Sequence, residues 1–161
     1  MSAIPILYHK QHDYVYNNEQ RILTVADLPE EPIDTGWVDL TQYIENTYHY
    51  AARPDQPPKV RRIGNVVYLA GEIYCKVSVG AMSSTLLINM PAQFAPDLQQ
   101  INGGGTQYEV TGSSYMIYVE KNQNGTCQIR ISQPDKKIVQ TGNWQGYALS
   151  NIPPYLAAPL D

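Results

Sequence analysis

The sequence predicts an all-β protein, an antiparallel β-sandwich with a jelly-roll or barrel-like arrangement, on three observations. Apolar and polar residues alternate with a period of two over residues 66–79, two clear hairpin signals join strand-like runs, and glycine or proline interrupts the chain about every ten residues. A period of two puts alternate side chains on opposite faces, as in a strand buried on one side. No stretch has a convincing apolar period of 3.6 residues, so no long helix is expected.

The first hairpin signal lies in VRRIGNVVYLAGEIYCKVSV, residues 60–79. Gly64-Asn65 is a two-residue turn with glycine first, as a type II′ turn prefers. This turn pairs Ile63 with Val66 and, further out, Val60 with Leu69. The alternation then continues to residue 79, which predicts one long strand with a single buried face.

The second hairpin signal lies in YMIYVEKNQNGTCQIRIS, residues 115–132, where Asn122 to Gly125 form the turn. Apolar side chains alternate on both sides of it, which predicts two strands buried on one face. Asn124-Gly125-Thr126 also matches the glycosylation sequon, but the match falls in the predicted turn and is interpreted as a turn only.

Shorter patterns predict the remaining elements. Strands are expected at residues 36–40, 85–89, 107–111 and 145–150, and one helical turn is expected around residues 41–45. Gly103-Gly104-Gly105 lies between polar residues with no helix behind it, and is interpreted as a flexible loop.

The composition changes before Asp34, which predicts two parts, a connector at residues 1–33 and a β-sandwich domain at residues 34–161. Residues 29–32 read Pro-Glu-Glu-Pro, and proline on both sides of two acids is typical of an extended linker. The connector is too small to hold a core alone, so we expect it to pack against the sandwich or a neighbouring subunit.

Charge and composition exclude some functional classes. Charged residues make up 16% of the 161 residues and the net charge is -4, so the chain offers no uniform positive field for nucleic-acid phosphates. No segment has the roughly 20 apolar residues of a membrane span, and no export signal is expected. The 13 tyrosines suit half-wet surfaces, subunit interfaces and ligand platforms, or else reflect the preference of strands for tyrosine.

Cysteine and histidine give no prediction of a metal or cofactor site. Cys75 and Cys127 are the only cysteines, lie in apolar runs, and are predicted to be buried free thiols. His9 and His12 would point to opposite faces of a strand, so no metal is expected there, and no cofactor is expected.

The familiar catalytic motifs are also missing. There is no GxxxxGK[ST] phosphate loop, no GxSxG nucleophile elbow and no HExxH zinc pair. A pair of carboxylates such as glycosidases use stays open, since spacing alone does not test it. We therefore expect a protein that is not an enzyme.

TYHYAARPDQPP, residues 47–58, is the most unusual stretch of the chain. It combines three tyrosine and histidine rings with three prolines that stiffen the backbone and disfavour regular pairing. Next to it lies the only basic cluster, Arg53, Lys59, Arg61 and Arg62. This cluster either binds phosphate or carboxylate groups, or guards an edge hairpin against aggregation.

The order of motifs resembles the C-terminal head of tail-tip receptor-binding proteins from siphophages of Gram-positive bacteria, of the listerial and lactococcal type. The matching residues are GWVDLT at 36–41, VRRIGNVVYLAGEI at 60–73, MPAQFAP at 90–96, IYVEKNQNGTCQIRI at 117–131 and a closing W-x-x-Y-x-L at 144–149. The resemblance covers residues 36–150, but its motifs specify a scaffold, so a function inferred from it is an analogy.

The resemblance implies a homotrimeric β-sandwich head that adsorbs the virion to a host cell-wall saccharide such as a teichoic acid. The connector would then be a shoulder or stem that joins the head to other tail or baseplate proteins at the distal tail tip. Weak single sites would gain strength through multivalency. The alternatives are a glycan depolymerase and a structural baseplate or fibre adaptor that contacts only phage proteins.

Candidate saccharide-binding residues follow from the largest irregular loop and from the end of the chain. Exposed aromatic rings beside polar groups can form sugar platforms. The candidates are Tyr48, His49, Tyr50, Arg53, Asp55, Asn143, Trp144 and Tyr147. For Trp144 and Tyr147, packing in the core or in a trimer interface is the favoured alternative.

Overall fold

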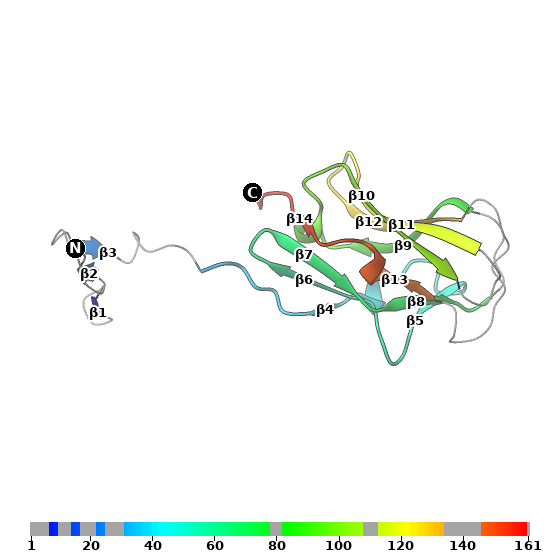
Figure 1. Cartoon of the computed structure of the whole chain (residues 1–161), viewed down its shortest axis with the longest axis horizontal. Coiled ribbons are helices and arrows are strands. Elements are labelled where there is room, and N and C mark those ends of the chain that lie inside the picture. Colours follow the sequence, from blue (N-terminus) through cyan, green and yellow to red (C-terminus); the bar gives the residue numbers. More distant parts are fainter. Residues whose placement is uncertain are drawn as a thin grey trace. The chain divides into compact units, whose positions relative to one another are not determined.

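The computed structural model divides the chain into two compact units, Met1–Pro32 and Ile33–Asp161, hereafter the N-terminal unit and the main unit. It describes residues 7–9, 14–16, 22–24, 31–77, 82–107, 113–133 and 146–160. Within these ranges the regular backbone consists of β-strands and short 3-10 helices, with no α-helix (Figure 1). The predicted all-β class is confirmed.

The described residues of the N-terminal unit form three short strands. They are β1 (Leu7–His9), β2 (Tyr14–Tyr16) and β3 (Ile22–Thr24). They form an antiparallel sheet in the order β1-β2-β3.

The described residues of the main unit form three antiparallel sheets, with strand orders β10-β11-β12-β9, β14-β7-β6-β4 and β13-β8-β5. Its elements are β4 (Val38–Asp39), η2 (Thr41–Tyr43), β5 (Tyr50–Ala52), β6 (Lys59–Ile63), β7 (Val66–Ala70), β8 (Glu72–Cys75), β9 (Met82–Met90), η3 (Ala92–Phe94), β10 (Gln100–Gln107), β11 (Ser113–Lys121), β12 (Cys127–Gln133), β13 (Gly146–Ala148), η4 (Leu149–Asn151) and β14 (Tyr155–Leu156).

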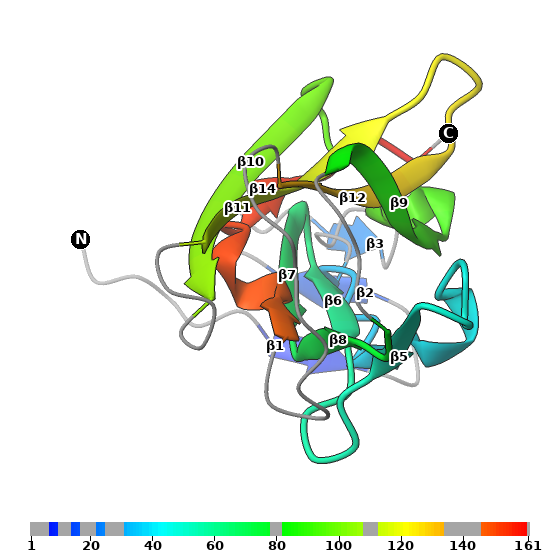
Figure 2. The same ribbon diagram turned by 90° about the vertical axis from the view of Figure 1, so that its right-hand side faces the viewer.

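The core lies between two layers. Viewed from one end, the β9–β12 sheet covers β6, β7 and β8 (Figure 2). Inward side chains from both layers are fully buried, which gives a sandwich-like fold that does not close into a barrel in the described part of the chain. The buried aliphatic side chains include Val60, Val67, Ile73, Leu87, Ile88, Ile117, Val119, Ile129 and Ile131.

The β6–β7 hairpin has the predicted register. Ile63 pairs with Val66 and Val60 pairs with Leu69. Gly64 has a φ of 57°, whereas Asn65 is not in the positive-φ region, and this combination fits the predicted type II′ turn.

The long strand predicted after this turn is divided by Gly71. Burial alternates as expected, with Val67, Leu69, Ile73 and Cys75 inside. However, Gly71 has a φ of 84°, so the chain bends there and β7 and β8 belong to different sheets. The apolar pattern continues through the bend because the inward face of both strands lines the same core.

The β11–β12 hairpin confirms the second turn prediction. Gly125 N donates to Asn122 O, Asn122 N donates to Thr126 O, and Gly125 has a φ of 79°. The predicted inward residues on both strands are buried. The sequon residues therefore form the turn of this hairpin.

Most of the shorter predictions also have a counterpart. The predicted strand at 36–40 contains the short β4 (Val38–Asp39), and residues 85–89 lie within the longer β9. Of residues 145–150, those from Gly146 on lie in β13 and η4. Residues 41–43 form η2, which is the predicted helical turn. Of residues 107–111, only Gln107 lies in the described part, as the last residue of β10.

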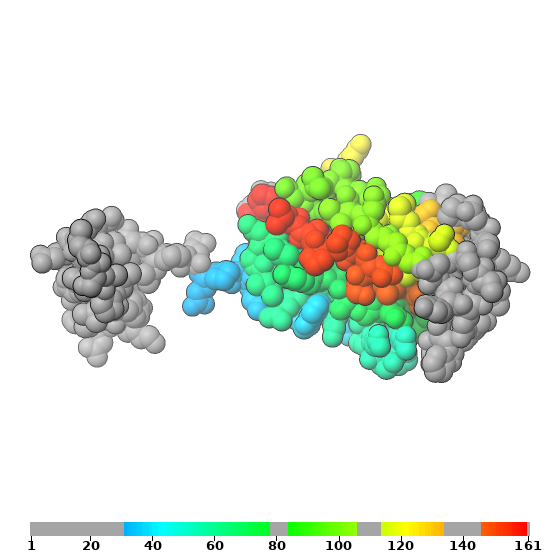
Figure 3. Space-filling model, viewed as in Figure 1, coloured from blue at the N-terminus to red at the C-terminus, as the bar shows by residue number. Residues whose placement is uncertain are grey.

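The prediction of a flexible glycine loop is wrong, because Gly103, Gly104 and Gly105 lie inside β10. A Cβ on Gly103 would lie 2.0 Å from the carbonyl oxygen of Asn151, so only glycine lets η4 pack this closely. In the space-filling view, residues 146–160 run as a red band along the side of the main unit between its two layers (Figure 3). The glycines therefore serve close packing.

Candidate saccharide-binding surface around β5

Residues 47–58 are less irregular than predicted. Tyr50–Ala52 form β5, which pairs with β8 so that Tyr50 lies opposite Cys75. The prolines disfavour pairing only after Ala52, where the loop 53–58 separates β5 from β6. The candidate surface therefore consists of a turn before β5 and a loop after it.

The turn before β5 is fixed by Asn46. Asn46 has a φ of 50°, a region that asparagine tolerates better than most residues. Its carbonyl oxygen accepts hydrogen bonds from His49 N at 2.9 Å and Tyr50 N at 3.1 Å. Asn46 Nδ2 also lies 2.8 Å from His49 Nδ1. Both the backbone and the histidine ring are thus held by this one residue.

The turn is also tied to neighbouring strands. Lys76 N donates to His49 O at 2.7 Å, and Lys76 Nζ donates to Thr47 O at 2.8 Å. On the other side, Asn89 Nδ2 on β9 donates to Glu45 Oε1 at 2.6 Å. The turn is therefore ordered without a ligand, which lowers the loss of conformational entropy on binding.

Tyr48 is the exposed aromatic residue of this turn. Its side chain is 74% exposed, and its ring centroid lies 5.2 Å from that of His49, with the planes tilted by 56°. A flat apolar face with a phenol hydroxyl at its edge can stack on a sugar ring and hydrogen-bond its hydroxyls. Tyr48 and His49 thus meet the geometric requirement for a small platform.

Tyr50 does not belong to this platform, which corrects its assignment as a candidate ligand contact. It is 1% exposed, because its position in β5 turns the side chain into the core. Burial raises the pKa of Tyr50 to about 12, so its hydroxyl stays neutral at physiological pH. Of the three adjacent rings, Tyr48 is exposed, His49 is half-buried and Tyr50 is buried.

The loop after β5 is organised by Arg53. Its guanidinium contacts Asp55 Oδ1 at 2.8 Å and Glu72 Oε2 at 2.7 Å. The hydrogen bond to Glu72 is the largest cause that raises the pKa of Arg53, and the hydrogen bond to Asp55 comes next. The hydrogen bond from Arg53 in turn lowers the pKa of Asp55. Because two carboxylates already bind the guanidinium, Arg53 stabilises the loop and offers little free charge to an anion.

Gly71 lets this loop approach β7 and β8. Glu72 N donates to Gln56 O, and a Cβ on Gly71 would lie only 2.1 Å from Pro57 O. Asp55 remains 64% exposed at the tip and can accept hydrogen bonds from a ligand. Tyr48 and Asp55 lie on opposite sides of the three-residue β5, roughly 10–15 Å apart along the strand direction.

The basic cluster does not form an anion site. Arg61 pairs with Asp34 at 2.6 Å, and the Lys59 ammonium lies 5.1 Å from the centroid of the Trp37 ring. Arg62 is 2% exposed and donates to Gly64 O and to Gln93 O. These cations bind separate partners within the fold. The alternative of an edge guard is not supported either, because β6 lies between β7 and β4 in its sheet.

Tyr147 is also corrected, since it is fully buried. Its hydroxyl accepts from Cys75 Sγ at 3.6 Å and donates to Gln133 Oε1 at 3.3 Å, and its ring meets that of Tyr115 edge-on at 5.0 Å. The core alternative is therefore confirmed for Tyr147. Asn143 and Trp144 lie outside the described residues.

Thiols and metal ligands complete the survey of reactive groups. Cys75 and Cys127 are buried free cysteines, as predicted, and burial raises their pKa values to about 11 and about 12. In the part of the chain that the structure describes, no three His, Cys, Asp or Glu side chains come together as metal ligands. Among the same residues, no helix is long and apolar enough to cross a membrane.

Sequence reasoning missed the residues that hold the surface in place, namely Asn46, Glu72 and Lys76. Only Asn46 carries a local signal, since asparagine is typical of tight turns. The partners of Glu72 and Lys76 lie 19 and 29 residues away along the chain, so no spacing rule could have found them.

Comparison of the chain with protein-family models, with curated proteins and with solved structures gives no significant match.

Proposed function

We propose that this chain is the non-catalytic head of a phage tail-tip receptor-binding protein, which adsorbs the virion to a cell-wall saccharide of a Gram-positive host. The observation that carries the proposal is the Tyr48–His49 turn, in which the exposed Tyr48 ring lies beside the half-buried His49 ring and the turn is held by Asn46 and Lys76. The resemblance of residues 36–150 to such heads supplies the biological setting and remains an analogy.

The place of the turn in the main unit supports this proposal. The unit begins at Ile33, whose carbonyl accepts from Gly64 N in the β6–β7 turn. The Tyr48 turn is hydrogen-bonded to Lys76, which follows the end of β8, whereas Gly64 precedes the start of β7 (Figure 1). A binding surface far from the point where the chain enters is the arrangement that a terminal head requires.

Weak binding at this surface is sufficient if the head is multivalent. One tyrosine ring, one histidine ring and an exposed aspartate bury little area, so a single site would have low affinity. In the proposed homotrimer three such sites act at high effective concentration, and several trimers on one tail multiply the effect. Light scattering would test this, because a trimer has three times the 18.1 kDa mass of the chain.

The direct test uses a fluorescent fusion of the full chain and purified cell walls from Gram-positive bacteria. We expect labelling of walls from a sensitive host, and a loss of about tenfold in affinity for Tyr48→Ala, as for a central contact residue. Tyr68→Ala is the matched control, because Tyr68 is a partly exposed tyrosine on β7 outside this surface.

Three results would overturn the proposal. Absence of labelling on every wall would exclude saccharide adsorption, and unchanged host adsorption by virions that lack the main unit would favour the structural adaptor. Release of reducing ends or glycerophosphate from wall polymer would favour the depolymerase.

A further inference from the structure

A pocket lies at the other end of the main unit from the Tyr48 turn. It has a volume of about 430 Å³ and is lined by Ala92, Gln93, Ala95, Lys121, Gly125, Ala158, Pro159 and Leu160. Ala157 N donates to Asn65 O, which places this pocket beside the β6–β7 turn and away from Tyr48. Its volume falls within the range of sites that hold small molecules.

The walls of the pocket are held by main-chain hydrogen bonds. Ala158 N donates to Ala95 O at 2.8 Å, and Asp97 N donates to Leu156 O at 2.8 Å. The carbonyl oxygen of Gln93 accepts a hydrogen bond from the buried Arg62 at 2.7 Å. The segment 156–158 and the turn after η3 therefore form one connected wall, so the pocket exists before any ligand binds.

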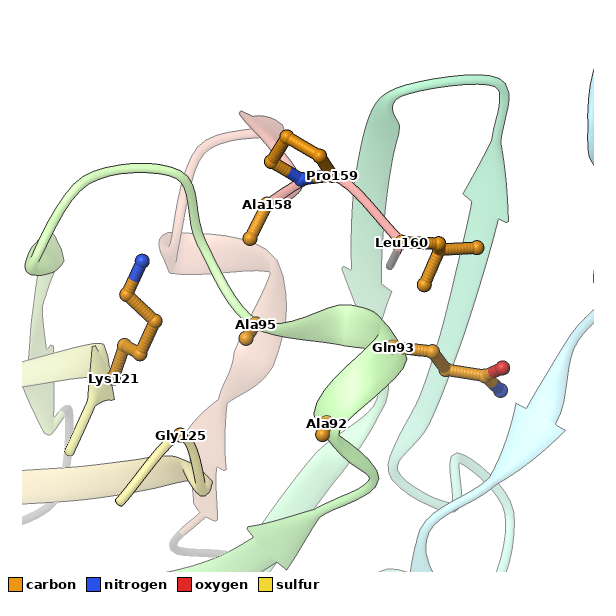
Figure 4. Close-up of a pocket in the computed structure, with 8 residues that line it drawn as sticks. All are labelled: Ala92, Gln93, Ala95, Lys121, Gly125, Ala158, Pro159 and Leu160. Carbon is orange, nitrogen blue, oxygen red and sulfur yellow. The ribbon is translucent and has the colours of Figure 1, made fainter. Parts of the chain in front are cut away.

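The lining combines small apolar residues with the polar Gln93 and a single cation, Lys121. In Figure 4, Lys121 lies on one side and Leu160 on the other, with Ala95 between them and Ala158 and Pro159 above. Alanine methyl groups and a proline ring favour an apolar surface of similar size. A bound molecule would meet this surface and the lysine together.

Lys121 has a free charge within the described residues. Its ammonium donates only to the main-chain oxygen of Asp97, at a long 3.4 Å, and no described carboxylate pairs with it. A carboxylate at this position would form a charge-assisted hydrogen bond. The pocket offers one ammonium, which matches the single charge of a carboxylate better than the double charge of a phosphate.

We propose that this pocket binds a small carboxylate whose body carries a methyl-bearing acyl group. The carboxylate contacts the Lys121 ammonium, and the methyl group packs against Ala95 and Ala158. N-acylated amino acids and acylated sugar acids both supply this chemistry. The proposal concerns a separate site and does not depend on saccharide binding at Tyr48.

The test is a titration of the full chain, followed by calorimetry or by NMR shifts. N-acetylalanine and N-acetylmuramic acid represent the two sources, and N-acetylalaninamide and the primary amide of N-acetylmuramic acid are their neutral counterparts. We expect each acid that binds to bind at least about tenfold more tightly than its neutral counterpart. Which acid binds more tightly identifies the source.

Variants locate the binding. Lys121→Met keeps the apolar stem but removes the charge, and should lower the affinity about tenfold. Lys59→Met is the matched control, since it removes a lysine charge on β6 outside the pocket. Ala158→Leu should fill the pocket and abolish binding, and it keeps the test decisive if the lysine variant folds poorly. The proposal is wrong if neither acid binds, if the neutral counterparts bind equally well, or if Ala158→Leu leaves binding unchanged.

Discussion

Two neighbouring glycines of β10 should respond to alanine with opposite sign. A Cβ on Gly103 would lie 2.0 Å from Asn151 O, whereas ordinary contact begins at 3.4 Å, so η4 would have to move by about 1.4 Å. Overpacking of this kind costs about 1–3 kcal/mol, and contact with backbone atoms places it near the upper end. At Gly104 the nearest atom is 3.6 Å away, and alanine should stabilise the strand by about 0.5–1 kcal/mol.

Denaturant unfolding of the full chain measures this difference. We expect Gly104→Ala to raise the free energy of unfolding by about 0.5–1 kcal/mol and Gly103→Ala to lower it by about 2 kcal/mol. The two positions share one strand and neither has a positive φ, so the contact with η4 is the main difference between them. Equal effects of the two variants would refute the close packing of η4 on β10.

Three further predictions follow from the same structure. Gly71→Ala should lower the free energy of unfolding by about 2–5 kcal/mol, and Gly125→Ala by only about 1–2 kcal/mol. Both glycines have a φ near 80°, but only a Cβ on Gly71 would meet a carbonyl oxygen. Equal midpoints in denaturant unfolding would contradict this. The Cys127 thiol, with a pKa of about 12, should react with a disulfide reagent at pH 8 only on unfolding; rapid native modification would contradict its burial. The hydrogen bond with Arg61 lowers the pKa of Asp34 from 3.8 to about 2, so the ionised carboxylate stabilises the fold above pH 3.8. This stability is lost as the pH falls through 2. The difference in Tm between Asp34→Asn and the parent should therefore shrink between pH 4.5 and 2, and a constant difference would contradict the pairing.

The sequence predicts the hairpins well because their determinants are local. Gly64-Asn65 and the Asn122–Gly125 turn supply the backbone conformations that reverse the chain, and alternation on either side then sets register and burial. Sequence patterns of this kind depend on residues fewer than ten positions apart. The fold class could therefore be predicted without any homologue.

Contacts between distant segments could not be predicted in this way. Gly103 meets Asn151, 48 residues later in the chain, and Gly71 meets Pro57 across the strand pair. From the sequence alone, three consecutive glycines indicate flexibility, because the side of the strand on which a second segment packs is unknown. In this structure the absence of a Cβ on glycine instead allows the backbone of a second segment to pack closely against the strand.

The candidate site changed because exposure depends on where the turn ends and β5 begins. Tyr48, His49 and Tyr50 are adjacent in sequence, yet Tyr48 is 74% exposed and Tyr50 is 1% exposed. Residues two apart in a strand share a face, but Tyr48 lies in the turn and Tyr50 is the first residue of β5. Pairing of β5 with β8 fixes this boundary, and the prolines after β5 led sequence reasoning to treat the whole stretch as irregular.

The arginines show in another way why residue type alone does not identify a binding surface. Arg53 and Arg62 lie in one basic stretch, but Arg53 is compensated by two carboxylates while Arg62 is buried and bound to two carbonyl oxygens. Both join segments of the fold, since Arg53 ties a loop to β8 and Arg62 ties the β6–β7 turn to the turn after β9. Lys121 stands alone in the sequence and yet lacks a carboxylate partner among the described residues. Clustering of basic residues in the sequence therefore does not identify the cations that lack a carboxylate partner, because the fold decides which partner each cation meets.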